Sequence, residues 1–129
     1  MQNRVVRVTI LLAALVALIG CGANFKQNMY KSLATMQVSY DVGMRSAADL
    51  HKKGFISEEG KQEIIAAGNT YATAHNDAVE AMKEYQQSGT EDKKAQARAI
   101  SRVVLKSYNA LLSVLLQFGI TGEPVEPWF

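Results

Sequence analysis

The stretch SEEGKQEIIAAGNTYATAHNDAVEAMKEYQQSG, residues 57–89, decides the fold. Its apolar and small residues recur at intervals of four and three, which places them on one face of a helix. They are Ile64, Gly68, Tyr71, His75, Ala78, Met82 and Tyr85, with Ile65, Ala72 and Val79 widening the face. Ser57 followed by two glutamates is typical of a helix start, and Gly89 is typical of a helix end. The sequence therefore predicts one long amphipathic helix here.

The segments on either side carry the same spacing. The preceding segment, which ends at Gly54, has Met29, Leu33, Met36, Tyr40, Gly43, Ala47 and Leu50 on its apolar face. The following segment starts after Thr90, ends at Gly119, and has Ala97, Ile100, Val104, Leu111, Leu115 and Phe118, thickened by Val103, Leu112, Val114 and Leu116. Because the connections are short, consecutive helices should run antiparallel. We predict an all-α, up-down-up three-helix bundle over residues 28–119.

Residues 120–129 form a tail that cannot continue the third helix, because Pro124 and Pro127 interrupt it. Trp128 and Phe129 are costly to leave in water, so they either pack on the bundle or contact a partner. Because the third helix leads away from the N-terminal end, we expect both aromatic residues at the far end of the bundle.

The N-terminal stretch has the parts of a secretory signal. Arg4 and Arg7 precede an apolar run, Val8–Ile19, that is broken only by Thr9 and followed by the small residue Gly20. The run is too short to span a bilayer, which takes about 20 residues. We predict that residues 1–20 are a cleaved signal peptide and that residues 21–27 are a short linker.

The sequence Leu18-Ile19-Gly20-Cys21 resembles a bacterial lipobox. The resemblance implies cleavage between Gly20 and Cys21, a diacylglyceryl group on the Cys21 thiol, and an acyl chain such as palmitate on the new amine. Ile19 departs from the commonest pattern, which has Ala or Ser there. Gly22, in place of an aspartate, implies the outer membrane, with the protein facing the periplasm. The alternative is an ordinary signal peptide followed by an accidental cysteine.

Charge and cysteine content restrict the classes of partner. The chain has 14 basic and 12 acidic residues, and removing Arg4 and Arg7 with the signal leaves the two numbers equal. A neutral domain lacks the basic character expected of a nucleic-acid-binding protein. The single cysteine excludes an internal disulfide.

Residues with possible chemistry have plainer interpretations. His75 lies on the apolar face of the middle helix and has no second histidine at metal-ligand spacing, so a packed core histidine is favoured over a metal site. Glu58, Glu59, Glu63, Glu80 and Glu84 alternate with lysines, as on a solvated helix face. No activated nucleophile is evident. We therefore expect no enzyme activity, no metal and no cofactor.

Gly43 and Gly68 lie on the predicted core faces, where glycine is unfavourable for a helix. They indicate close approach of two helices. Alternatively, they line a groove for an apolar ligand or a partner helix, together with Met36, Met44, Met82, Tyr40 and Tyr71.

These observations predict a lipid-anchored cell-envelope protein that acts by binding or scaffolding. Trp128, Phe129 and His75 are the candidate contacts with an envelope protein partner or a ligand. One alternative is a module that binds a small apolar molecule between its helices, and another is a phage-encoded envelope lipoprotein. The oligomeric state is open.

Overall fold

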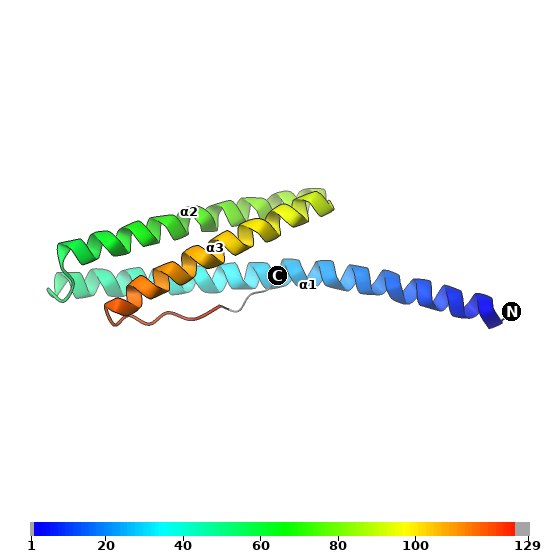
Figure 1. Cartoon of the computed structure of the whole chain (residues 1–129), viewed down its shortest axis with the longest axis horizontal. Helices are drawn as coiled ribbons and strands as arrows, with labels where there is room; N and C mark the ends of the chain where they lie inside the picture. The colour runs from blue at the N-terminus through cyan, green and yellow to red at the C-terminus, as the bar shows by residue number, and fades with distance from the viewer. Residues whose placement is uncertain (1, 126–129) are drawn as a thin grey trace.

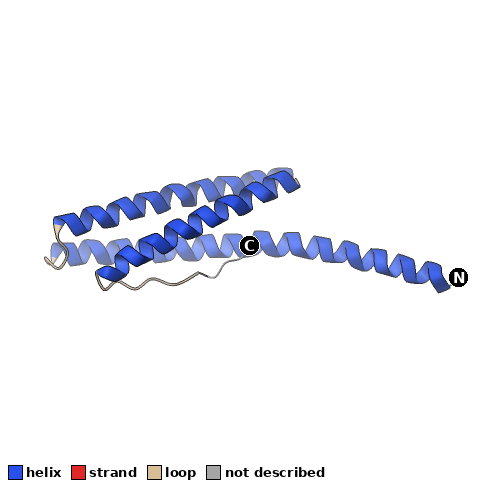
Figure 2. Ribbon diagram, viewed as in Figure 1, coloured by secondary structure: helices blue, strands red, loops and turns tan. Residues whose placement is uncertain are grey.

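The computed structural model describes the backbone of residues 2–125 and the side chains of residues 25–125. Three helices follow one another: α1 (Gln2–Lys52), α2 (Glu58–Ser88) and α3 (Glu91–Gln117). α2 returns along α1, and α3 runs in the direction of α1 again (Figure 1). No strand occurs in the part of the chain described, as Figure 2 shows. The predicted all-α three-helix bundle is confirmed.

The helix ends lie where the sequence indicates. The Ser57 hydroxyl accepts a hydrogen bond from the Gly60 amide at 3.1 Å, and the Thr90 hydroxyl accepts one from the Lys93 amide at 3.3 Å. Gly54 and Gly89 follow α1 and α2 with φ of 79° and 63°, a left-handed conformation that glycine adopts without strain. These short turns make the bundle antiparallel at each connection.

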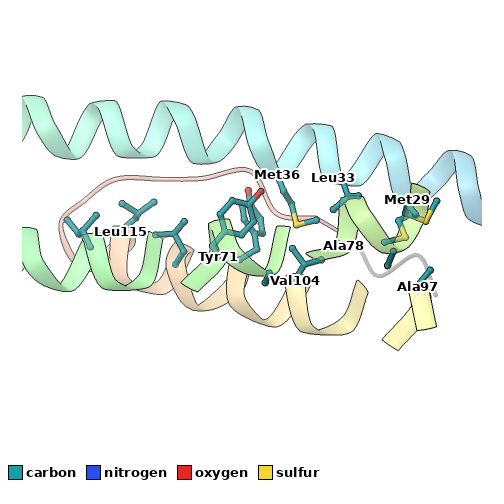
Figure 3. Close-up of a cluster of buried hydrophobic side chains, with 14 of the residues drawn as sticks. Met29, Leu33, Met36, Tyr71, Ala78, Ala97, Val104 and Leu115 are labelled. Atoms are coloured by element: carbon teal, nitrogen blue, oxygen red, sulfur yellow. The ribbon is translucent and has the colours of Figure 1, made fainter. Parts of the chain in front are cut away.

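One apolar core runs along the bundle (Figure 3). Its largest fully buried side chains are Tyr71, Tyr108, Met29, Met36, Ile64, Met82, Leu111, Leu115 and Val104. α2 and α3 contact each other most extensively, and α1 and α3 contact each other least. Small buried side chains on α2 and α3, among them Ala74, Ala78 and Ala97, allow this close approach.

α3 is the one helix among the described residues that is long and apolar enough to span a membrane by composition. The core helix of a bundle has the same composition, and α3 buries seven of its residues.

The packed part of α1 begins earlier than predicted. Phe25 is only 4% exposed, so the buried face of α1 reaches three residues ahead of the predicted bundle boundary at residue 28. The reason lies in the spacing, because Phe25 stands four residues before Met29 and extends the same apolar face.

The face of α3 also differs in part from the prediction. Ser101, Leu105 and Tyr108 are buried, whereas Val103 and Leu116 are 55% and 62% exposed. Ser101 sits in the core because its hydroxyl donates to the Ala97 carbonyl at 2.6 Å and lies 3.0 Å from the Met29 sulfur. Because apolar residues follow one another closely in α3, their spacing does not show which of them face the core.

The tail turns back at the end of α3. Gly119 has φ of 76°, and the Ile120 amide donates to the Leu115 carbonyl at 3.1 Å, which places Ile120 in the core at 7% exposure. The chain then returns along α1 toward the other end of the bundle (Figure 1). The tail therefore packs on the bundle as far as Val125, which lies partly buried against the core. Trp128 and Phe129 lie outside the described residues.

Candidate functional site

The predicted anchoring site lies in α1. Gly20 and Cys21 belong to its backbone, but the side chains of residues 2–24 lie outside the described part. The first described side chain, Phe25, is already in the core, four residues after Cys21. Lipidation of Cys21 stays a prediction.

The returning tail, residues 119–125, forms what we call the C-terminal strap. Both backbone groups of Glu123 are held: its carbonyl accepts a hydrogen bond from the Tyr108 hydroxyl, and its amide donates to the Ser39 hydroxyl at 3.2 Å. Gly122 lies so close to Leu112 that a Cβ at this position would overlap the Leu112 Cδ2 atom. The strap is thus fixed to α3 by Tyr108 and Leu112, and to α1 by Ser39.

A groove of about 530 Å³ runs between the strap and α1. It is lined by Ala34, Thr35, Val38, Ser39, Val42, Thr121, Gly122 and Glu123. Val38 and Val42 are 65% and 56% exposed, although they are apolar. They stand one helical turn apart on the same face. The groove therefore presents apolar side chains beside a fixed segment of backbone.

An aromatic cluster fills the core next to the strap. The Tyr71 ring centroid lies 5.1 Å from that of Tyr40 and 5.6 Å from those of Tyr108 and His75. The Tyr71 hydroxyl is buried without a hydrogen-bond partner among the described residues. Burial raises the pKa of this hydroxyl, and Tyr108 adds to the effect. Burial likewise raises the pKa of Tyr108.

The two histidines occupy different places. The His75 Nε2 atom donates to the Leu33 carbonyl on α1 at 3.1 Å, so this half-buried side chain ties α2 to α1 within the packing. The His51 Nδ1 atom donates to the Ile56 carbonyl at 2.9 Å, and its Nε2 atom faces Glu58 at 3.5 Å. No three His, Cys, Asp or Glu side chains of residues 25–125 gather as a metal site would require.

The two glycines of the predicted core allow close packing. A Cβ on Gly43 would lie 2.8 Å from the Leu115 Cδ1 atom, and one on Gly68 would lie 3.1 Å from the Met44 Cε atom. Close approach, the first of the two interpretations, is confirmed. Met36 and Met82 are wholly buried, whereas Met44 is half-buried and lines a second cleft, between α1 and α2.

The glutamates lie on the exposed helix faces. Lys61 pairs with Glu58 at 3.1 Å and Lys83 with Glu80 at 2.8 Å, each within one turn of α2. Hydrogen bonds from Gln62 and, to a smaller extent, from Lys61 lower the pKa of Glu58. Ion pairs as exposed as these contribute little to stability.

The sequence did not identify Ser39, Tyr108 or Gly122 as strap contacts. The first two lie 84 and 15 residues from their partner Glu123, and no spacing rule connects them. Compared with known proteins, the chain matches no protein-family model, no curated protein sequence and no solved structure.

Proposed function

We propose that this protein is a lipid-anchored component of the bacterial cell envelope that acts by binding or scaffolding. The lipobox-like sequence ending at Cys21 supports the anchor. Phe25 lies four positions after Cys21, which is about 6 Å along a helix. A lipid on Cys21 would therefore hold the bundle directly at the membrane surface. By resemblance, Gly22 assigns that surface to the outer membrane, with the bundle in the periplasm.

The observation that carries a binding role is the groove beside the C-terminal strap. Val38 and Val42 are largely exposed there, next to a strap whose backbone is fixed by Tyr108 and Ser39. An exposed apolar surface is typical of a protein-binding site. Because the shape of this one is already fixed, a partner that binds it does not have to order it at a cost in conformational entropy. We infer that an envelope protein contacts this face.

Anchoring is tested by Cys21→Ser in cells that express the full chain. The wild-type protein should incorporate a labelled fatty acid and stay in the membrane fraction after a salt or carbonate wash. Cys21→Ser should incorporate no label and leave the membrane fraction or accumulate uncleaved. Equal labelling of the two proteins would contradict the proposed anchor.

Binding is tested with a photo-reactive amino acid at position 38 of the full chain in the native envelope. Asn69, exposed on α2, provides the control position. A defined crosslinked species that forms at position 38 and not at position 69 supports the contact. The same products at both positions, or none at position 38, would exclude this face.

A further inference from the structure

A second cleft, of about 280 Å³, lies between the last part of α1 and the first turns of α2. Its lining consists of Met44, Ala47, Ala48, His51, Lys52, Lys61, Ile64 and Ile65. It is separate from the groove beside the strap, because the two share no lining residue.

The walls of this cleft are aliphatic. Ile64 and Ala47 are buried beneath it at 2% and 6% exposure, and the half-buried Ile65 continues the wall on α2. On α1, Ala48 leaves room because its side chain is short. Met44 lies over Gly68, where its terminal methyl group is 3.1 Å from the position of an added Cβ. A flexible methionine in the wall can adjust to an occupant.

Cationic groups stand among the lining residues. Lys61 forms an ion pair with Glu58 at 3.1 Å, and the His51 Nε2 atom lies 3.5 Å from the same carboxylate. Lys52 is exposed and forms no ion pair with any described residue. The lining residues themselves carry no carboxylate, and Glu58, which borders them, pairs with Lys61, so Lys52 supplies the net positive charge of the cleft.

We propose that this cleft binds a free fatty acid, with the acyl chain between α1 and α2 and the carboxylate at Lys52 and Lys61. The volume is just below the range of about 300–1,000 Å³ typical of small-molecule sites, which suits one slender chain. The positive charge selects a carboxylate over a neutral or cationic head group. This inference does not depend on lipidation of Cys21.

The test uses the full chain reconstituted in phosphatidylcholine nanodiscs, with a decanoic acid that carries a terminal diazirine as the probe. After irradiation, mass spectrometry should locate the label within residues 44–52 and 61–65. Unlabelled decanoate should compete about two- to fivefold better than decanol, the contribution of one exposed ion pair, and decylamine should compete least.

Two kinds of variant keep the test decisive. Ala48→Trp should fill the cleft and remove the label, whereas Ala66→Trp, at an exposed position of α2, should not. In the double variant Lys52→Gln, Lys61→Gln, decanoate should compete with the probe no better than decanol does. This variant keeps the test valid even if Ala48→Trp fails to fold. Labelling confined to other segments, equal labelling of the two tryptophan variants, or equal competition by decylamine would overturn the proposal.

Discussion

The rings of Tyr71 and Tyr108 lie 5.6 Å apart in the middle of the core, yet only Tyr108 has a hydrogen-bond partner for its hydroxyl among the described residues. Both side chains are fully buried. The partner of Tyr108 is the carbonyl of Glu123 in the C-terminal strap. The two hydroxyl groups therefore differ in their contribution to the free energy of unfolding.

This difference predicts opposite effects of the same substitution. Tyr108→Phe should lower the free energy of unfolding by about 1 kcal/mol, because the Glu123 carbonyl loses its donor. Tyr71→Phe should raise it by about 1 kcal/mol, because a buried and unsatisfied hydroxyl is removed. Urea denaturation of the two variants measures both values. Equal losses in the two variants would show that Tyr71 has a partner after all.

The same pair predicts sensitivity to alkaline pH. Burial raises the pKa of both hydroxyl groups in the folded protein, whereas in the unfolded chain they ionise near pH 10. Above that pH the unfolded state binds fewer protons than the folded state. The contribution of the two tyrosines to the free energy of unfolding is therefore complete below pH 10. Above that pH it falls by at most about 1.4 kcal/mol per pH unit for each tyrosine.

Urea denaturation between pH 9 and pH 12 measures this slope. The double variant Tyr71→Phe, Tyr108→Phe should show a shallower slope than the wild type. An unchanged slope would mean that groups other than these two tyrosines cause the alkaline loss.

The strap should loosen when Gly122 acquires a side chain. Gly122→Ala places a methyl group against the Leu112 Cδ2 atom and 3.2 Å from the Ser39 Oγ atom, and we expect the strap to move away from both rather than Leu112 alone to change its rotamer. Hydrogen exchange at the Glu123 amide, which is bonded to Ser39, should then become faster, while amides in the middle of α2 stay protected. Thr121→Ala, at an exposed position of the strap, is the control and should leave the exchange unchanged. Unchanged exchange in Gly122→Ala would contradict the predicted movement of the strap and show that the Leu112 side chain moves instead.

Substitutions of two leucines test which face of α3 packs in the core. Leu111 is wholly buried and Leu116 is 62% exposed. Leu111→Asp should unfold the bundle, because a core that contributes a few kcal/mol of net stability does not tolerate a buried, unpaired charge. Leu116→Asp should keep the helical circular dichroism and change the unfolding free energy by about 0.5 kcal/mol or less. Comparable unfolding by both substitutions would contradict the register of α3.

The sequence predicted the parts of the fold that depend on local spacing. Ser57 and Thr90 start helices, and Gly54, Gly89 and Gly119 end them, because capping needs only residues a few positions apart. The core faces of α1 and α2 could also be predicted, since their apolar residues are separated by polar ones. On α3 the dense apolar run left Tyr108 unassigned and placed the exposed Leu116 inside.

The contacts of the tail could not be predicted from the sequence. Pro124 and Pro127 show that the helix ends, but they do not show where the chain goes next. The return along α1 depends on Ile120 entering the core and on Glu123 reaching Ser39, which are contacts between residues far apart in the sequence. The lining of the fatty-acid cleft has the same origin, because Ala48 and Ile65 come together only when α1 and α2 pack.

The intact mass of the full-length gene product, purified from a bacterial envelope, gives the sharpest test of a lipid anchor on Cys21. We predict a chain that starts at Cys21 and carries the added mass of a diacylglyceryl group, with or without a third acyl chain. Treatment that cleaves acyl esters should remove part of that mass, and Cys21→Ser should lack it. A chain that starts at another residue, or one that starts at Cys21 with an unmodified thiol, would exclude a lipid anchor on Cys21.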